Sequence, residues 1–530
     1  MDIPDNRVFT LASSFPERVA VQVFLIAIAF LVLWKHVQLR KLLNSVISTP
    51  INVYLCWKYP IQSSDRSVDI PTCPFRFPNG QGNIKFSEGR ARSREWGSEF
   101  GHIYRIWAGS TPEVVLTKHD QMPAVFKDSH LHIKSTNFDA GWLFGELVGK
   151  ALGLLNGGDW NRVRNIFAPP FHQAKVVNFL PVMERRVQQC LQELHENPKI
   201  HRNGTLILKP ADDLRLVSFW VLCDILYGDM SPEMEAQLLE IVEIREKVWA
   251  GVTAGGLARL SIGRFLPTPT KHALRTFRVM WAGFNRQAAD RARSLFDGLP
   301  PICDFFSAVD SGKLSEHEML DTMDEILFAN LDVTIGSLSW VLVFLAAHTD
   351  VQTDLRREIV ENKSRASPAV WDEYISQSST LLMACLLESA RLRPIASFSG
   401  AQSPPSDRQV DQYVIPAGTN VTVDIHALNN DDQAWGDDRY QFNPRRFLQA
   451  KNPSEFRYRL WRFGFGPRQC LGKYLADLFL KTLLSHILEN YSIQMKDSSQ
   501  RSMDDFKGNS NAWINLAAED VVWVKITNSE

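Results

Sequence analysis

The 530-residue sequence lacks the paired cysteines of a disulfide framework or a zinc finger. Its seven cysteines are scattered, odd in number and never spaced as CxxC, which indicates a reducing compartment. It also lacks a dominant charge, because 58 Lys and Arg stand against 59 Asp and Glu, for a formal net charge of −1. A nearly neutral chain is not drawn to nucleic acid as a whole, so no nucleic-acid partner is expected.

The sequence also lacks internal boundaries beyond residue 80. No Gly/Ser linker, repeat or low-complexity block divides it there, and no GxGxxG dinucleotide-binding unit occurs. Although 530 residues exceed the length of a typical single domain, this continuity predicts one large domain over residues 81–530. Hydrophobic residues make up 45% of the chain, which supports a sizeable core.

One long apolar run is present near the N-terminus. Residues 19–34 read VAVQVFLIAIAFLVLW, about one bilayer in length once flanking residues are included. Lys35 is the first of three basic residues that follow, and such residues stay on the cytosolic side. We therefore expect a transmembrane anchor over residues 19–35 and a lumenal N-terminus over residues 1–18. No small-residue cleavage site marks a signal peptide; a buried helix of a soluble protein is the alternative.

The remaining sequence predicts a linker and then a mainly α domain with a minor β portion. Prolines make residues 36–80 an extended linker and hinge. Periodic apolar patterns dominate residues 158–395, and the longest of them, residues 316–348, contains no proline. Alternating patterns and turn residues predict a β-hairpin formed by residues 103–109 and 113–117, strands at 413–415 and 420–425 around a turn at 416–419, and a final strand at 521–526. A further helical run covers residues 381–392.

The most informative segment is residues 463–472, which read FGFGPRQCLG and precede a helix-forming run. Gly466 and Gly472 let the loop turn tightly and let backbone N–H groups face the sulfur of Cys470. Those donors and the following helix N-terminus favour a thiolate, the form that binds iron. Arg468 carries a permanent charge suited to a haem propionate. The pattern predicts a thiolate ligand for haem iron, against the alternative of a buried cysteine in a glycine-rich turn.

This loop, from Phe463 to Gly472, resembles the haem-binding signature of the cytochrome P450 family. The resemblance extends, in the family's order, to an ExxR motif at Glu388 and Arg391 and to a PxRF-type motif containing Arg446. It implies the cytochrome P450 fold around a buried haem b. It also implies that these three charged residues form a buried structural triad, in which the loss of one member costs roughly 3–5 kcal/mol.

Trp160 and Arg164 resemble the family's WxxxR helix. Indole and guanidinium are both donors, and their spacing places them on one helix face, where both can reach a haem propionate. Relatives often have a further arginine where this sequence has Ala401. Haem binding is therefore expected to depend more heavily on Trp160, Arg164 and Arg468.

The long helix carries the segment ANLDVT at residues 329–334, where the family pattern is small-Gly-x-acid-Thr-Thr. Asp332 matches the acid that can relay protons to bound oxygen. Asn330 replaces the glycine, and Val333 replaces the threonine whose hydroxyl usually holds a water. Thr334 follows but points elsewhere on an ideal helix, unless a local bulge turns it back. Proton delivery is expected to use Asp332 with Asn330, Thr334, ordered water or the substrate.

The resemblance implies a membrane-anchored monooxygenase of the fungal secondary-metabolite type. Electrons would come from NADPH through a separate NADPH-cytochrome reductase, a flavoprotein, with the catalytic domain on the cytosolic side of the endoplasmic reticulum membrane. The small-molecule substrate would be bulky and apolar, with a diketopiperazine or another peptide-derived product as the narrower choice. A reductase-independent isomerase or dehydratase is the first alternative, and a non-enzymatic membrane haem-binding protein is the second.

Two surfaces follow from the same resemblance. Basic residues concentrated between Phe442 and Lys473, with Arg162 and Lys175, suit a face that docks an acidic redox partner; a merely solvated basic face is the alternative. The substrate pocket is expected to be lined by residues 135–144, parts of 214–260, 328–334, 395–399 and 509–514.

Overall fold

The computed structural model describes residues 46–77, 79–82, 84–202, 205–295, 298–364, 368–450, 453–496 and 521–526. The predicted lumenal segment, the membrane anchor and part of the linker lie outside these residues, as does the predicted pocket segment 509–514. Within the described residues one helix, α14 (Glu316–Ala347), is long and apolar enough to span a bilayer. However, 72% of its most apolar stretch is buried inside the protein, so α14 is a core helix.

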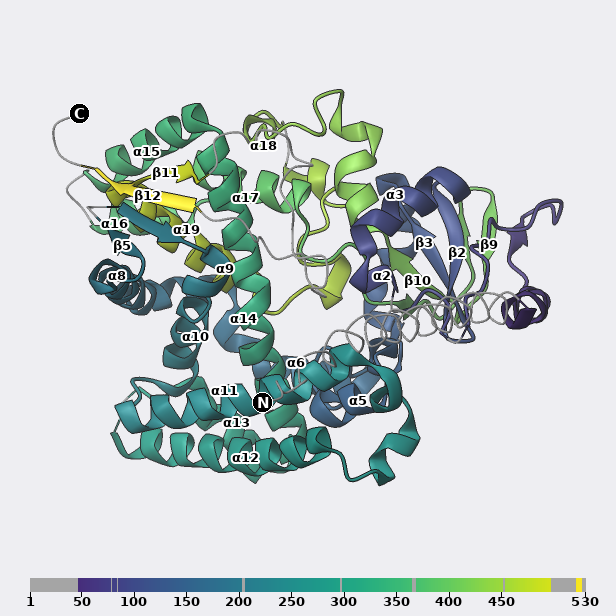
Figure 1. Cartoon of the computed structure of the whole chain (residues 1–530), viewed down its shortest axis with the longest axis horizontal. Helices are drawn as coiled ribbons and strands as arrows, with labels where there is room; N and C mark the ends of the chain where they lie inside the picture. Colours follow the sequence, from purple (N-terminus) through teal and green to yellow (C-terminus); the bar gives the residue numbers. More distant parts are fainter. Residues whose placement is uncertain are drawn as a thin grey trace, which may run out of the picture.

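Helix α14 begins where the sequence provides a capping box. The hydroxyl of Ser315 accepts the N–H of Glu318, and the carboxylate of Glu318 accepts the N–H of Ser315. The helix ends at Ala347, one residue before the predicted end. It crosses the middle of the molecule (Figure 1), and most of its side chains are buried.

The other helices surround α14 and confirm the predicted mainly α domain. They are α2 (Ile84–Ser87), α3 (Gly89–Phe100), α4 (Met122–Phe126), α5 (Trp142–Val148), α6 (Gly157–Phe167), α7 (Gln173–Val176), α8 (Leu180–Glu196), α9 (Pro210–Asp213), α10 (Val217–Tyr227), α11 (Pro232–Ala254), α12 (Pro269–Leu295), α13 (Pro301–Asp310), α15 (Thr349–Lys363), α16 (Pro368–Ser376), α17 (Leu381–Leu392), α18 (Arg445–Leu448) and α19 (Lys473–Asn490).

The β portion forms three small sheets, in the orders β1-β9-β8, β2-β3-β10-β7-β4 and β11-β12-β6-β5. Their strands are β1 (Gln62–Ser63), β2 (Ile103–Ala108), β3 (Thr111–Leu116), β4 (Ile133–Lys134), β5 (His201–Arg202), β6 (Thr205–Leu208), β7 (Gln402–Ser403), β8 (Arg408–Val410), β9 (Tyr413–Ile415), β10 (Asn420–Val423), β11 (Tyr491–Met495) and β12 (Val521–Lys525).

The sheets confirm the predicted hairpin, and the two strands on either side of the predicted turn join different sheets. β2 and β3 pair antiparallel, with Ile103 opposite Leu116. The two strands that flank the predicted turn at residues 416–419 do not pair with each other: β9 joins β8 and β1, whereas β10 runs parallel to β3. A parallel partner this far away in sequence leaves no local signal, because the alternating pattern reports only which face is buried.

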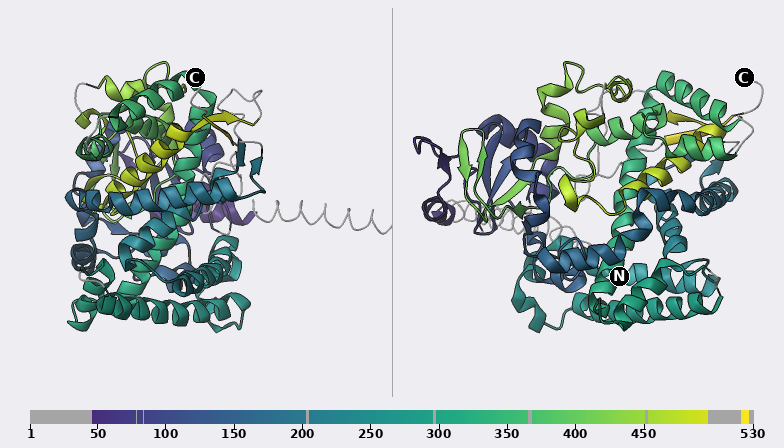
Figure 2. Two further views of the ribbon diagram at one scale, coloured as in Figure 1. Left: turned by 90° about the vertical axis from the view of Figure 1, so that its left-hand side faces the viewer. Right: turned by 180° about the vertical axis from the view of Figure 1, so that it is seen from behind.

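The elements divide into a β-rich end and a helical body. Strands β2, β3, β9 and β10 gather with α2 and α3 at one end, and α8 to α16 and α19 lie around α14 at the other (Figure 1). The view from behind in Figure 2 shows the same division. A helix over residues 46–58 packs on the β-rich end through Leu55, which contacts Phe75 and Trp107. The Cys470 loop precedes α19 and faces α14 across the cavity described below.

Candidate functional site: a cysteine loop with a cationic cradle

The Cys470 loop turns back on itself through its own backbone. The N–H of Cys470 donates to the carbonyl oxygen of Phe463 over 2.9 Å. The φ angles of Gly464 and Gly466 are 86° and 70°, in a region that costs other residues roughly 1–2 kcal/mol. Glycine at both positions therefore permits the tight return that presents the sulfur.

Gly466 is also required by space. The 3-10 turn η11 (Gly466–Arg468) packs against η2 (Ser129–Leu131). A Cβ at position 466 would lie 2.7 Å from the carbonyl oxygen of Phe126 and closer still to the hydroxyl of Ser129. The same hydroxyl donates to the carbonyl oxygen of Phe465 over 3.3 Å. A segment more than 300 residues earlier thus fixes the position of the loop.

The thiol of Cys470 lies just before the N-terminus of α19, whose N-cap residue is Gly472. The side chain of Cys470 is exposed. Protein atoms nevertheless surround the sulfur on several sides, and this partial removal from water raises the pKa of the thiol above its usual value. The N–H of Gly472 and the charge of Arg164 act in the opposite direction and are outweighed. The loop alone therefore favours the thiolate less than the sequence pattern predicts.

Two predicted propionate ligands lie beside this loop on different elements. Arg164 of α6 donates to the carbonyl oxygen of Gln469 over 3.0 Å. Arg468 donates to Leu155, His132 and Asn156, all of them neutral acceptors. Both guanidinium groups approach the ring of Trp160, at 5.9 Å and 4.9 Å from its centroid.

The two guanidinium groups have no carboxylate within ion-pairing distance among the described residues. Burial lowers the pKa of Arg164, and burial with the charge of Arg164 lowers the pKa of Arg468 to about 10. Two cations held close together without counter-ions are suited to an anionic ligand. The structure thus places Trp160, Arg164 and Arg468 together next to Cys470.

Side chains of α14 accept hydrogen bonds from the backbone of the segment that precedes α6. The carboxylates of Asp321 and Glu325 accept the N–H groups of Lys150 and Gly153 over 2.8 and 2.9 Å. The hydroxyl of Thr322 accepts the N–H of Leu152 over 3.1 Å. These three hydrogen bonds provide partners for the backbone N–H groups of the segment before α6. No sequence motif marks these residues, because their partners lie about 170 positions away.

A cavity of about 220 Å³ separates α14 from the Cys470 loop. Its lining is Val333, Thr334, Ser337, Ala390, Pro394, Ile395, Ala396, Ile425, Trp461, Arg462, Phe463, Ala476 and Leu480. One wall comes from α14 and the opposite wall from the Cys470 loop and α19, as a flat macrocycle bound between them requires. This cavity is a mainly apolar slot lined by Phe463 of the Cys470 loop; together with the guanidinium groups of Arg164 and Arg468 beside that loop, it fits a haem with its two carboxylates.

The α14 wall differs in detail from the sequence-based expectation. α14 runs through residues 329–334 without a bulge, and both Val333 and Thr334 line the cavity. The expectation that Thr334 points elsewhere on a regular helix is therefore wrong. Its hydroxyl donates to the side-chain oxygen of Asn330 one turn earlier, so the two predicted polar residues act as a pair.

Asp332 is less buried than the sequence suggested. Its side chain is 30% exposed and accepts two bonds from Arg215, over 3.2 and 3.1 Å. Arg215 also binds Glu246 of α11 over 2.6 Å. Sequence reasoning missed Arg215 because it belongs to no motif and reaches Asp332 from 117 positions away.

The predicted triad is assembled around Glu388. Its carboxylate accepts bonds from Arg391 over 2.7 and 2.8 Å and from Arg446 over 3.1 Å. Glu388 and Arg391 are fully buried, and the side chain of Arg446 is 12% exposed. Asp438, which no motif marks, is a second carboxylate partner of Arg446 at 3.0 Å. The four groups join α17 to the segment that contains α18.

The predicted basic docking face is largely neutralised within the molecule. Arg445 pairs with Asp354, Arg446 with Glu388, Arg459 with Glu455, Arg462 with Asp477, and Arg162 with Glu318. Among the described residues, Lys175, Arg457 and Lys473 have no carboxylate partner within 4 Å. The basic cluster in the sequence therefore overstates the basic charge at the surface.

Aromatic side chains from separate elements meet in the predicted substrate region. Phe144 of α5 lies 6.4 Å from Phe138 and 6.0 Å from Trp249 of α11, between ring centroids. Asn137 and Phe138 adopt positive φ angles of 53° and 48°, a strained conformation that often occurs at functional sites.

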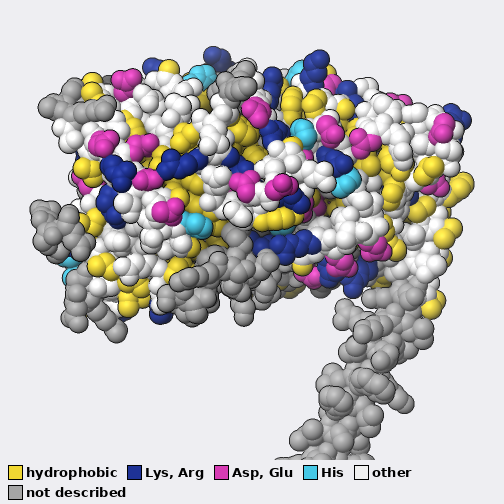
Figure 3. Space-filling view, turned by 90° about the horizontal axis from the view of Figure 1, so that it is seen from above, with side chains coloured by type: hydrophobic (Ala, Val, Ile, Leu, Met, Phe, Trp, Pro, Cys, Tyr) yellow, Lys and Arg dark blue, Asp and Glu magenta, His cyan; other side chains and the backbone are white. Residues whose placement is uncertain are grey.

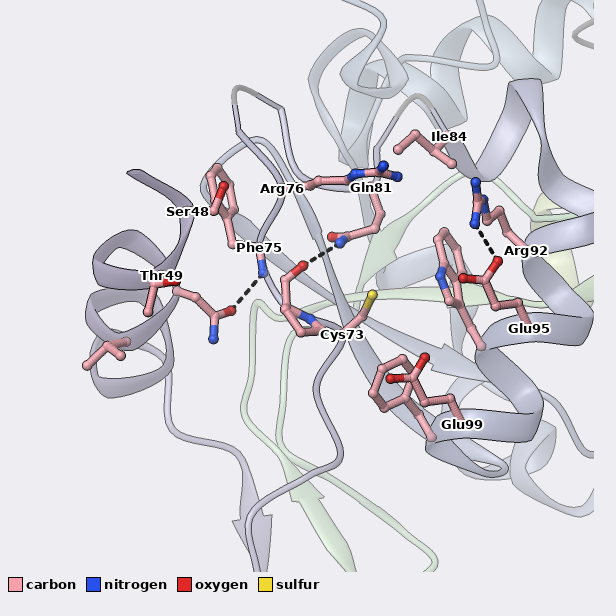
Figure 4. Close-up of a pocket in the computed structure, with 15 residues that line it drawn as sticks. Ser48, Thr49, Cys73, Phe75, Arg76, Gln81, Ile84, Arg92, Glu95 and Glu99 are labelled. Atoms are coloured by element: carbon pink, nitrogen blue, oxygen red, sulfur yellow. Dashed lines mark hydrogen bonds and ion pairs between the residues drawn. The ribbon is translucent and has the colours of Figure 1, made fainter. Parts of the chain in front are cut away.

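A larger cavity of about 570 Å³ shares no residue with the Cys470 loop. It lies between the helix over residues 46–58 and α3, as Figure 4 shows. The carboxylate of Glu95 pairs with Arg92 on its wall, and Asn52 accepts the N–H of Phe75 over 2.8 Å. Size alone does not make it the reaction site, because the thiol and the unpaired cations lie elsewhere.

Comparison with known proteins places this geometry in a family. The family model described as Cytochrome P450 matches residues 82–513. The chain is 42% identical over 472 residues to the cytochrome P450 monooxygenase asaD of Aspergillus flavus, covering 89% of each chain. It is 40% identical to the cytochrome P450 monooxygenase aclC of Aspergillus oryzae, over 87% of this chain and 93% of that one.

A third fungal relative, the cytochrome P450 monooxygenase roqR of Penicillium rubens, is 40% identical over 86% of each chain. These matches confirm the fold class and the monooxygenase activity inferred from the Cys470 loop. A family model that covers most of the chain, a mainly helical fold and a glycine-bracketed cysteine facing α14 all agree, and the chain belongs to the cytochrome P450 family of haem-thiolate monooxygenases.

Proposed function

We propose that this monooxygenase holds haem b through Cys470 and oxidises a bulky apolar natural product, with electrons from NADPH delivered by a separate flavoprotein reductase. The observation that carries the proposal is the Cys470 loop itself: two guanidinium groups without carboxylate partners lie beside it, and its residue Phe463 lines a cavity whose opposite wall is α14. Haem with a thiolate ligand supplies dioxygen activation when bound. The protein supplies the thiolate, the cations, the proton route and the substrate pocket.

Cys470 is the proposed axial ligand, and Phe463, Gly466 and Gly472 shape the loop that presents it. Arg164, Arg468 and the indole of Trp160 would bind the propionates, since these donors lie together and lack other anionic partners. Glu388, Arg391 and Arg446 act structurally, because they join two segments that flank the loop and touch no part of the slot.

Proton delivery would involve two groups on α14. The Thr334 hydroxyl lines the cavity and donates to the side-chain oxygen of Asn330, so the Thr334 oxygen can accept a hydrogen bond from a water in the cavity and orient it. Asp332 is partly exposed and can exchange protons with solvent, with Arg215 fixing its orientation. This division suits a helix that has Val333 where a second hydroxyl usually stands.

The proposed substrate follows from the cluster of aromatic side chains in the predicted substrate region. Phe138, Phe144 and Trp249 offer flat apolar faces from three elements, which suit a bulky, rigid, apolar molecule. A diketopiperazine or another peptide-derived natural product matches this description. The reductase would dock near the few surface cations without carboxylate partners, Lys175, Arg457 and Lys473.

The proposed location is the endoplasmic reticulum membrane, with a single anchor over residues 19–35 and the catalytic domain in the cytosol. The support is the sequence run itself together with the exposed apolar side chains of the helix over residues 46–58, which comes later in the chain. Exposed Val53, Tyr54 and Trp57 on this helix suit a position at the membrane surface.

A second candidate reaction keeps the haem but needs no reductase. Val333 removes one hydroxyl from the oxygen side of the slot, as a rearrangement or dehydration would tolerate. The presence of Asp332 and of the Thr334–Asn330 pair favours oxygen activation, which consumes protons.

The test compares metabolites of the native producer with those of the same strain carrying Cys470→Ala, by high-resolution mass spectrometry. We expect a precursor that is one oxygen lighter, or two hydrogens heavier, than the lost product. An isomeric precursor would instead support the rearrangement. In membranes that contain the reductase, product formation should also require NADPH; turnover without NADPH contradicts the monooxygenase proposal.

A further inference from the structure

Arg462 brings a charge into the wall of the slot between α14 and the Cys470 loop. Among the described residues that line this cavity, all the others are uncharged. The side chain of Arg462 is 9% exposed, so little water reaches it. A guanidinium in an apolar cavity is costly unless an opposite charge compensates it. Arg462 therefore depends on a partner close to the slot.

Asp477 of α19 is that partner. Its carboxylate forms an ion pair with Arg462, and its side chain is 21% exposed. The preceding residue, Ala476, lines the cavity, whereas Asp477 does not. The guanidinium of Arg462 also lies 4.5 Å from the ring centroid of Phe463 in the Cys470 loop. The pair is therefore oriented, with its positive end at the slot and its negative end outside the lining.

The negative end of the pair acts on the sulfur of Cys470. Burial raises the pKa of this thiol, and the charges of Glu325 and Asp477 add to the effect. Asp477 thus opposes negative charge at the sulfur, whereas Arg462, which faces the slot, favours negative charge there. Transfer of an electron to haem iron adds one negative charge to the slot. The two side chains therefore act on haem reduction with opposite signs.

The ion pair also distinguishes Arg462 from the two guanidinium groups assigned to the propionates. Arg164 and Arg468 donate to neutral acceptors, so an anionic ligand can still compensate their charges. The charge of Arg462 is already matched by Asp477. Arg462 is therefore suited to acting on the slot through its field and not to binding a further carboxylate.

We infer that Arg462 sets how readily haem iron accepts an electron, and that Asp477 is the positioning residue that holds this charge against the slot. This inference rests on the proposed haem site and deepens it. The step moves one electron from the reduced flavoprotein to the iron, so that flavin is oxidised and ferric iron becomes ferrous. A fixed positive charge beside the slot stabilises the added negative charge and raises the reduction potential.

The test measures the midpoint potential of the purified, haem-loaded protein by spectroelectrochemistry. Arg462→Gln removes the charge but can still donate to Asp477; we expect a lower potential, by about tenfold in the reduction equilibrium or about 59 mV for one electron. Asp477→Asn should raise the potential, because it removes the opposing charge. Arg462→Lys keeps the charge and should stay close to wild type.

A neighbouring ion pair provides the matched control. Arg459 and Glu455 pair over 2.9 Å, and the side chain of Arg459 is 16% exposed, but neither residue lines the cavity. Arg459→Gln and Glu455→Gln should each change the reduction equilibrium by less than about twofold. Arg462→Gln combined with Asp477→Asn should return close to wild type, because the two opposite contributions are removed together.

The sign of the shifts separates a charge effect from a structural one. Entry of water into a disturbed slot would move the potential in one direction in both single variants, so shifts of the same sign overturn the inference. Unchanged potentials in both variants overturn it as well. A wild type that takes up no haem overturns the proposed function and this inference with it.

The variants are expected to fold. Without Arg462, Asp477 keeps Lys481, one helix turn later on α19, as a cation whose charge interacts with its own. Haem content and circular dichroism check each protein before the titration. If Arg462→Gln takes up no haem, Asp477→Asn decides the question by itself: a raised potential supports the inference, and an unchanged or lowered one overturns it.

Discussion

Asp332 is held in place by Arg215, which also binds Glu246 of α11. An arginine shared between two carboxylates donates hydrogen bonds to both and fixes the orientation of each. Asp332 belongs to α14 next to Val333 in the cavity wall, whereas Glu246 belongs to a helix outside it. The two carboxylates therefore share one partner but differ in access to the reaction.

Substitution of these two acids separates proton delivery from structural support. Asp332→Asn keeps the shape and removes the titratable group; we expect kcat to fall by about 10²-fold, as for loss of general acid catalysis, with a larger solvent deuterium isotope effect. Glu246→Gln is the matched control and should change kcat by less than about threefold. Equal losses in both variants would show that Arg215 positioning, and not the Asp332 proton, limits the reaction.

Asp424 is a second residue with a testable role, because its burial makes the free energy of unfolding depend on pH. It is fully buried after β10, accepts the hydroxyl of Ser93 and the N–H of Ala427 through one oxygen, and leaves the other oxygen without a partner. Burial raises the pKa of this carboxyl to about 7. The folded protein therefore binds a proton here that the unfolded chain has released above about pH 4.

Because the pKa of Asp424 is higher in the folded protein than in the unfolded chain, protonation of this carboxyl stabilises the fold. Stability contributed by this proton is present at low pH and is lost as the pH rises through about 7. Relative to Asp424→Asn, which keeps the accepting oxygen, the wild-type free energy of unfolding should fall by about 1 kcal/mol per pH unit between pH 5 and 7. Urea unfolding of both proteins at each pH measures this difference, in which other titrating groups cancel. Parallel curves would mean that Asp424 is ionised throughout.

At the scale of elements, the Glu388 cluster joins α17 to the segment around α18. Glu388 and Arg391 are one helix turn apart and meet from local geometry alone. Arg446 comes from a separate short helix, 58 positions from Glu388. Adjacent Arg445 forms a more exposed ion pair with Asp354, in which the two side chains are 56% and 33% exposed.

These adjacent arginines provide an internally matched test. Arg446→Gln leaves Glu388 and Asp438 with one partner fewer, so we expect a loss of about 3 kcal/mol in the free energy of unfolding. Arg445→Gln removes an exposed pair and should cost less than about 1 kcal/mol; Asp354 keeps Arg357 as a partner. Urea midpoints of the two variants are compared. Similar losses would mean that burial around Glu388 adds nothing to the strength of the pair.

Elements that depend on local sequence were predicted correctly, whereas contacts between distant segments were not. The Cys470 loop, α14, α17 and the β2–β3 hairpin depend on local spacing, caps and turns, and the sequence predicted each of them. The Arg215 contact depends on segments that meet from distant parts of the chain. Local patterns do not contain such contacts, so Arg215 was missed, and the paired surface charges were overestimated as a basic face.

At the scale of the whole molecule, positive and negative side chains are nearly equal in number. On the face shown in Figure 3, Lys and Arg side chains lie among Asp and Glu side chains, in keeping with a net charge of −1. Steering by a large basic field is therefore weak, and association with a membrane has to depend mainly on apolar contacts.

The helix over residues 46–58 supplies such contacts on the side away from the body. Leu55 packs inward on Phe75 and Trp107, whereas Val46, Val53, Tyr54 and Trp57 remain 53% to 77% exposed. A helix that is apolar on both faces is stable at a surface only if a second apolar phase covers the outer one.

We therefore expect a chain that begins at residue 46 to bind phospholipid vesicles without the predicted anchor. Replacing Val53, Tyr54 and Trp57 together by serine should weaken binding at least tenfold, since each buried apolar side chain contributes roughly 1.5 kcal/mol or more. Val279→Ser on α12 is the control, because that side chain is 75% exposed but isolated. Vesicle flotation measures the bound fraction. If the triple variant floats as well as the parent chain, the outer face of this helix does not contact lipid, and any attachment of the protein to membranes would depend on residues 19–35 alone.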